Sequence, residues 1–279
     1  MSDHFAAFSF VDRIADLVPG TRARGAFAIP ATIASFPPCL MAEAVGQLAA
    51  WVAMSHIGFR GRPVAALASE TRFIRGAKPG DTLALTVEID DCDDEAVAYR
   101  GWADIDGTRA IELVDCLGPM LPLADFDDPA AMRERFEILT GAGATPGRFG
   151  GVELPRATPH GGASATSVQG VLDVPETAPF FNDHFPRRAV FPATLMLDAQ
   201  IDMALALARE SAHWRRGATL APVRMTHVKV RSFTAPGTRL ALKTEMRPPS
   251  NGDATFMLAA EADGRTVATA RVVIAEKTA

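Results

Sequence analysis

The chain has 279 residues, of which 48% are hydrophobic and 22% are charged, so it can form one large globular domain or two smaller ones. Its net charge of -5 provides no diffuse basic field, and nucleic acid is therefore not an expected partner. The three cysteines, Cys39, Cys92 and Cys116, have no metal-ligand spacing and predict free thiols in a reducing compartment.

The N-terminal segment does not have the pattern of a secretion signal, because no basic stretch is followed by an apolar one. Glu43 interrupts the longest apolar run before that run is long enough to span a bilayer. We therefore expect a cytoplasmic protein with no membrane partner.

Along the chain, the same order of predicted elements occurs twice. A strand is expected at 21–30, an apolar helix at 39–54, and then strands that alternate apolar and polar residues around Pro-Gly and Asp-Gly turns. The composition changes at 123–162, which predicts a short polar helix and a Gly/Pro-rich linker. A strand at 166–175, an apolar helix after Phe191 and further strands follow. One helix with a set of strands makes an α+β unit whose helix lies in the core.

The two sets of elements are copies of each other. Pro79, Gly80, Leu83 and Leu85 match Pro236, Gly237, Leu240 and Leu242 at a constant offset of 157 positions. The segments "FPPCLMAEA" at 36–44 and "FPATLMLDA" at 191–199 match at an offset of 155. Two long repeats indicate a duplicated domain rather than a solenoid. We expect a first repeat at 1–124, a helix and linker at 125–162, and a second repeat at 163–279.

The segment "FFNDHFPRRAVFPATLMLDAQ" at 180–200 resembles the signature of the bacterial β-hydroxyacyl-ACP dehydratases (FabZ/FabA-like). In that family a His-Phe-Pro loop precedes a Pro-Gly helix start and an acid one turn inside the helix. The segments at 8–25 and 70–89 are similar to the family's N-terminal and following strands. The resemblance implies a tandem double hot-dog, an α+β fold in which an antiparallel sheet wraps each central helix. It also implies active sites that combine the histidine of one hot dog with the acid of the other.

The first repeat lacks the histidine loop. Five residues separate Pro30 from Phe36, whereas fifteen separate Pro175 from Phe191. The first repeat also has Pro38 where the family has the helix-start glycine, and proline has no N–H to offer an incoming carbonyl. Both losses fall in the same repeat, so one intact site is expected.

That site would pair His184 of the second repeat with Glu43 of the first, while Asp198 and Asp202 would belong to a relic site. An imidazole with an ordinary pKa of about 6.5 supplies a neutral base, and an apolar environment favours the protonated carboxyl that can donate to a leaving hydroxyl. The remaining predicted residues are Gln47 to orient the acid, Ala193 with its helix-start N–H for the oxyanion, Phe185 and Pro192 for substrate contact, and Arg187 and Arg188 for phosphopantetheine or carrier-protein contacts. No cofactor or metal is expected.

Three functions remain open from the sequence. The first is dehydration of (3R)-hydroxyacyl thioesters on acyl carrier protein or CoA; the others are hot-dog thioester hydrolysis and non-catalytic binding of acyl chains or carrier protein. The duplicated dehydratases of polyketide synthases are also similar, but in that family the histidine lies in the first hot dog and the acid in the second. The fused pair would replace a homodimer, and further oligomerisation stays open.

Overall fold

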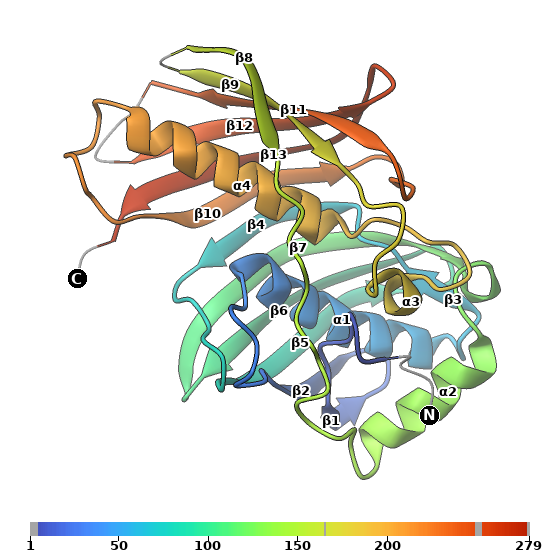
Figure 1. Ribbon diagram of the computed structural model, residues 1–279. Helices are drawn as coiled ribbons and strands as arrows, with labels where there is room; N and C mark the ends of the chain where they lie inside the picture. Colours follow the sequence, from blue (N-terminus) through green and yellow to red (C-terminus); the bar gives the residue numbers. More distant parts are fainter. Residues whose placement is uncertain (1–4, 165, 249–252, 278–279) are drawn as a thin grey trace.

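The computed structural model of the protein, which describes residues 5–164, 166–248 and 253–277, contains two α+β units side by side (Figure 1). A long helix lies against the sheet in each unit: α1 (Pro38–His56) in the first and α4 (Ala193–Glu210) in the second. The strands of the first unit are β1 (Arg13–Val18), β2 (Arg22–Ala28), β3 (Gly61–Pro63), β4 (Leu67–Phe73), β5 (Thr82–Cys92), β6 (Ala96–Ile105) and β7 (Thr108–Pro122). Those of the second are β8 (Thr158–Ser164), β9 (Ser167–Asp173), β10 (Leu220–Val230), β11 (Arg239–Met246), β12 (Ala254–Ala262) and β13 (Arg265–Glu276).

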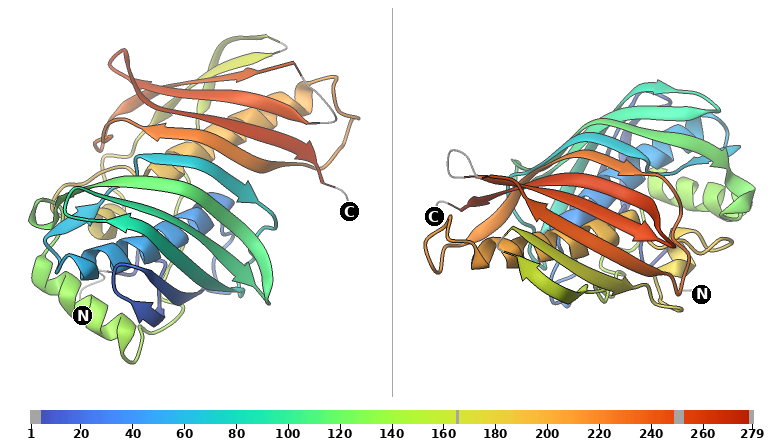
Figure 2. Two further views of the ribbon diagram at one scale, coloured as in Figure 1. Left: turned by 180° about the vertical axis from the view of Figure 1, so that it is seen from behind. Right: turned by 90° about the horizontal axis from the view of Figure 1, so that it is seen from above.

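One continuous antiparallel sheet joins the two units. Over the described residues its order is β1-β2-β5-β6-β7-β4-β10-β13-β12-β11-β9-β8, with β3 paired to β7. The seam is the pairing of β4 with β10, in which Leu67 faces Lys229 and Arg72 faces Arg224. Seen from behind, the strands of both units form a single curved surface that covers the two helices (Figure 2). Because the sheet is shared, the two helices are held in one fixed relationship.

The two long helices meet over this seam. Buried residues occur on every side of α1, from Cys39 and Leu40 at its start to Met54 near its end, as the uniformly apolar sequence predicts for a helix wrapped by sheet. The helix α1 contacts α4 directly. None of the helices in the described ranges combines the length and the hydrophobicity that a membrane crossing requires.

The segment between the repeats is more than a spacer. After a 3-10 turn, η1 (Leu123–Asp125), it forms α2 (Pro129–Thr140), capped by the Asp128 side chain, and then crosses in front of the helices to reach β8 (Figure 1). Phe149 in this crossing is 3% exposed and packs against the rings of Phe10 and Phe36. The linker therefore completes the core of the first unit.

The structure departs from the predicted linker at its end. Residues 158–162, assigned to the linker because of their Pro and Gly content, begin the strand β8. This strand lies at the outer edge of the sheet and pairs only with β9 in the described part of the chain. An edge strand tolerates Pro159 because one side of its backbone needs no partner.

Candidate active site

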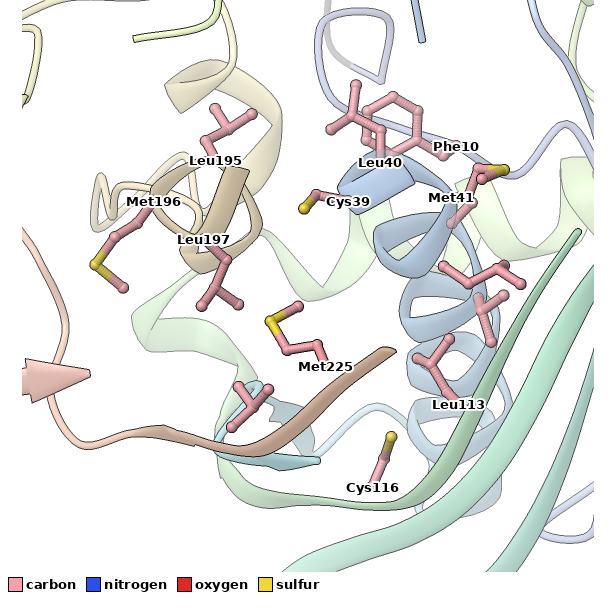
Figure 3. Close-up of a cluster of buried hydrophobic side chains, with 14 of the residues drawn as sticks. Phe10, Cys39, Leu40, Met41, Leu113, Cys116, Leu195, Met196, Leu197 and Met225 are labelled. Carbon is pink, nitrogen blue, oxygen red and sulfur yellow. The ribbon is translucent and has the colours of Figure 1, made fainter. Parts of the chain in front are cut away.

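A cavity of about 220 Å³ lies at the seam between the two units. Its walls come from α1, the start of α4, the strands β4, β6, β7 and β10, and the loop that carries His184. In the close-up, Cys39 on α1 and Leu197 on α4 face each other above Met225, with Cys116 below them on β7 (Figure 3). Glu43 and His184 both line this cavity, so the structure brings together the two groups that the sequence placed in different repeats.

The loop between Pro175 and Phe191 places His184 at the end of α3 (Phe181–His184), a single helical turn. Its Nδ1 atom lies 2.9 Å from the carbonyl oxygen of Val190. A carbonyl oxygen only accepts hydrogen bonds, so Nδ1 carries the proton of the neutral ring and Nε2 keeps a free lone pair. The ring packs between the rings of Phe8 and Phe185, with centroids 5.4 and 4.3 Å away.

The surroundings of His184 favour its neutral form. Burial is the main cause that lowers the pKa of this imidazole, and the guanidinium of Arg62 acts in the same direction. The Glu43 carboxyl and the Val190 carbonyl oppose the shift without reversing it. A neutral imidazole with a free Nε2 can accept a proton at neutral pH.

Each oxygen of the Glu43 carboxyl accepts one hydrogen bond. Gln47, one turn further along α1, donates from Nε2 to Oε1 at 3.1 Å. The amide of Gln47 cannot flip without loss, because its Oε1 accepts from the Phe10 N–H at 2.8 Å. The hydroxyl of Thr194, in the first turn of α4, donates to Oε2 of Glu43 at 2.9 Å. Both repeats therefore hold the carboxyl, and Gln47 lies where its predicted orienting role requires.

The site predicted to be a relic repeats this contact in reverse. Cys39 on α1 occupies the position that Thr194 has on α4, and its thiol is hydrogen-bonded to the Asp198 carboxyl. Burial raises the pKa of Asp198 to about 6, and it raises the pKa of the Cys39 thiol as well. Asp202 forms an ion pair with Arg156 of the linker at 3.1 Å. Cys39 is thus a buried, protonated thiol, and Asp198 lies outside the set of described residues that line the cavity.

The N-terminal segment of the first unit holds the histidine loop in place. Asp183, which is 4% exposed and precedes His184, accepts hydrogen bonds from the backbone N–H groups of Phe5, Ala7 and Phe8. Phe5 and Phe8 also line the cavity. The residues just before β1 therefore fix the loop of the other unit through its buried carboxylate.

Arg62, a site residue that the sequence does not reveal, lies beside His184. It forms an ion pair with Asp127 at 2.6 Å, and the side chain of Asp127 is only 1% exposed. The guanidinium also lies over the ring of Phe185, and its Nη2 atom is 3.4 Å from the His184 carbonyl oxygen. Arg62 comes from β3 and Asp127 from the start of the linker, so only the folded chain brings them together.

The other predicted residues differ in their positions. Ala193 begins α4 and lines the cavity, and in the described part of the chain its N–H has no hydrogen-bond partner. Pro38 begins α1, so the corresponding position of the first unit offers no N–H. Phe185 is buried and lines the cavity, whereas Pro192, at the N-cap of α4, is not among the described residues that do so.

Arg187 and Arg188 lie on the surface, outside the cavity wall. Arg187 forms an ion pair with Asp128 at 2.8 Å and donates to the Ala124 carbonyl, which docks the histidine loop on the linker. Arg188 lies over the rings of Phe126 and Phe233, and Phe233 lines the cavity. Of the two arginines, Arg188 is therefore the one beside the cavity wall.

Comparison with known proteins supports one family. The family model of the ApeI-like dehydratases matches residues 161–271. The chain is 30% identical over 113 residues to the 3-hydroxyacyl-[acyl-carrier-protein] dehydratase FabZ of Clostridium acetobutylicum, covering 80% of that protein and 37% of this chain. It is 31% identical over 110 residues to the FabZ of Ralstonia nicotianae, covering 67% of that protein and 39% of this chain.

Solved structures resemble the whole chain. A putative oleoyl thioesterase from Lactobacillus plantarum matches with a TM-score of 0.60 at 10% identity, over 95% of this chain and 99% of that one. A hot-dog protein of unknown function from Alicyclobacillus acidocaldarius matches with a TM-score of 0.53 at 14% identity, over 98% of each chain. At such identities the likeness concerns the fold, and it confirms the predicted double hot-dog. Together with the sequence relatives, it shows that the chain belongs to the FabZ-like family of hot-dog dehydratases.

Proposed function

We propose that the protein converts (3R)-hydroxyacyl thioesters, carried on acyl carrier protein or CoA, to trans-2-enoyl thioesters at a single composite site. The observation that carries the proposal is that His184 of the second repeat and Glu43 of the first line the same cavity. The hydrogen bond from Thr194 to Glu43 joins the two repeats at that point. The relatives from Ralstonia nicotianae and Clostridium acetobutylicum, both 3-hydroxyacyl-[acyl-carrier-protein] dehydratases, support this chemistry.

The elimination assigns one role to each group. His184 Nε2 takes the proton from C2, and the electron pair left on C2 forms the C2–C3 double bond as the C3–O bond breaks. Glu43 gives its proton to the departing hydroxyl, which leaves as water. The free N–H of Ala193, at the positive end of α4, would hold the thioester oxygen while negative charge develops on it. The proton on His184 then returns to Glu43, which restores the resting site.

The hydroxyl of Thr194 is compatible with the loss and return of the Glu43 proton. A hydroxyl both donates and accepts, so its contact with Glu43 can persist whether or not the carboxyl carries a proton. A positioned acid or base contributes about 10²- to 10⁴-fold to a rate. The relic site, with Asp198 but no histidine, would therefore be silent.

The decisive experiment measures enoyl formation from a (3R)-hydroxyacyl thioester by the purified protein and three variants. His184→Ala and Glu43→Gln should each lose at least about 10²-fold in kcat. Asp198→Asn is the matched control, because it changes the equivalent acid of the other repeat, and it should stay within a few-fold of the parent protein. Equal activity in all three variants would reject the composite site.

Thioester hydrolysis is the second reaction that this geometry allows. Both oxygens of Glu43 accept hydrogen bonds from neutral donors, an arrangement that also suits a carboxylate which orients water for attack on a thioester. Release of free thiol from an acyl-CoA, retained in His184→Ala and lost in Glu43→Gln, would favour hydrolysis. Retained acyl binding with neither reaction would favour the binding function.

A further inference from the structure

The side of α1 that faces the cavity has small residues where α4 has large ones. At the offset of 155 that aligns Glu43 with Asp198, the residues Ala42, Gly46 and Ala50 of α1 correspond to Leu197, Ile201 and Leu205 of α4. All three small residues line the cavity, and all three are half-buried in a helix whose other apolar residues are mostly buried. Over two turns, α1 therefore leaves space on this side, whereas α4 has large side chains at the equivalent positions.

Gly46 is the smallest of the three, and its backbone does not require glycine. It lies within α1 and is absent from the residues with positive φ in the described chain. A glycine inside a helix costs about 1 kcal/mol relative to alanine. A Cβ atom at this position would lie 3.3 Å from the hydroxyl oxygen of Tyr99. The absence of a side chain therefore lets the Tyr99 hydroxyl approach α1 closely and leaves this part of the cavity wall without a methyl group.

The Tyr99 hydroxyl beside Gly46 is held in place. Tyr99 on β6 faces Cys116 on β7 in the strand register, and the two side chains are hydrogen-bonded. Burial raises the pKa of the Tyr99 phenol well above its ordinary value, so the hydroxyl stays neutral. Both residues line the cavity. The phenol of Tyr99 therefore lies beside Gly46 as a fixed, uncharged part of the cavity wall.

Gly46 lies close to the reacting centre. It follows Glu43 by three residues, which corresponds to about 4.5 Å along a helix. An acyl chain whose C3 hydroxyl lies at Glu43 therefore reaches Gly46 within a few carbons. Met225, Leu197 and Leu113 contribute apolar side chains to the wall of the same cavity, as an alkyl chain requires.

We propose that Gly46, beside Tyr99, is the residue that sets the specificity of the cavity for extended, unbranched acyl chains. The chain of the substrate packs against the Ala42–Gly46–Ala50 side of α1, and a side chain at position 46, together with the Tyr99 phenol that it displaces, would occupy the space that the chain needs. This inference rests on the proposed function for the place of the thioester at His184 and Glu43.

Binding of inert ligands tests the inference apart from the reaction. S-butyl-CoA and S-dodecyl-CoA are thioethers that can be neither dehydrated nor hydrolysed, and their Kd values are measured by calorimetry. In Gly46→Ala the ratio of the dodecyl Kd to the butyl Kd should rise about tenfold, since expelling about two methylene groups from an apolar cavity has that effect. Gly46→Val should raise the ratio further.

A second substitution tests the part played by the Tyr99 hydroxyl. Tyr99→Phe removes the oxygen that the new Cβ would meet, so the double variant Gly46→Ala/Tyr99→Phe should return the ratio toward the parent value. Tyr99→Phe alone is the matched control and should not raise the ratio. Thermal unfolding shows whether each variant is folded, and Gly46→Ala is the safest because alanine favours helices.

Three outcomes would overturn the inference. These are an unchanged ratio in folded Gly46→Ala and Gly46→Val, no relief by Tyr99→Phe, and failure of the parent protein to bind either thioether. If the ratio changes as expected while no enoyl product forms from hydroxyacyl thioesters, the specificity role of Gly46 stands and the proposed reaction fails.

Discussion

The hydroxyl of Thr194, at the start of the second long helix, lies 2.9 Å from the carboxyl of Glu43 in the first long helix. The thiol of Cys39 makes the equivalent contact with Asp198 in the opposite direction. The two helices therefore exchange one hydrogen bond at each of two related points. The first of these points lies in the cavity that the imidazole of His184 also lines.

Removing the Thr194 hydroxyl should impair turnover more than binding. Thr194→Val keeps the shape of the side chain but leaves Oε2 of Glu43 without this donor, so kcat should fall about tenfold with KM changed much less. Thr194→Ser keeps the hydroxyl and should retain most of the activity. Cys39→Ala removes the mirror contact and is the control. Equal kcat values for Thr194→Val and Thr194→Ser would contradict a positioning role.

The lowered pKa of His184 predicts how stability depends on pH. Burial disfavours the charged imidazole in the folded state, so the unfolded chain binds more protons at this residue as the pH falls through about 6.5. The free energy of unfolding should therefore decrease below that pH. His184→Asn removes the titrating group and should flatten this part of the curve.

Chemical denaturation of both proteins between about pH 5 and 8 measures this effect, and parallel curves would contradict it. The same shift predicts that kcat/KM stays high below pH 6.5, because the base remains deprotonated there. A decline of kcat/KM centred above pH 6.5 on the acid side would show that another group controls the reaction.

The raised pKa of Asp198 predicts that stability depends on pH in the opposite direction at this residue. Its pKa of about 6 exceeds the ordinary 3.8, so the stability it contributes is present below about pH 4 and is lost as the pH rises through 6. Asp198→Asn should therefore stabilise the protein at pH 7.5, by about 1 to 3 kcal/mol, and should have little effect at pH 3.5. Asp94→Asn, which removes a surface ion pair with Arg60 and does not enter the causes of the Asp198 shift, is the control. Loss of stability at pH 7.5 would mean that the contact with Cys39 outweighs the burial of the carboxyl.

The sequence predicts the parts of this protein that local patterns encode. The repeat is visible because Pro-Gly and Asp-Gly turns recur at fixed offsets, and the helix α1 is visible because it is apolar on every side. The deletion before Phe36 assigns the histidine to one repeat. Gln47 is predicted beside Glu43 because one helical turn separates them, and the structure has that contact.

Local sequence patterns do not predict which distant segments of the chain contact each other. Thr194 stands one turn before Asp198 in the sequence, which suggests a contact within its own helix, yet it donates to Glu43 of the other repeat. In the sequence, Arg62 and Asp127 resemble ordinary surface charges. In the folded chain, β3 and the linker lie side by side at the site, and the two residues form a buried ion pair. Phe149 lies in a Gly/Pro-rich stretch that predicts a loose connection, although its ring is buried in the first unit.

The ion pair between Arg62 and Asp127 should matter for both stability and the site. Arg62→Met removes the cation from a carboxylate that is 1% exposed, and breaking one side of a buried pair typically costs about 3 to 5 kcal/mol. The double variant Arg62→Met/Asp127→Asn removes the buried charge as well, so it should recover a large part of the lost free energy of unfolding. Arg60→Met is the matched control, since Arg60 pairs with Asp94 on the surface and its loss should change the free energy of unfolding far less.

Arg62 also lies over Phe185 and near the carbonyl of His184, so its loss should loosen the histidine loop. The double variant should therefore stay below the parent protein in kcat even where its stability is restored, because the guanidinium contacts to the loop are still missing. Urea denaturation and steady-state rates on the same preparations separate the two effects. Full recovery of kcat in the double variant would limit Arg62 to balancing the charge of Asp127.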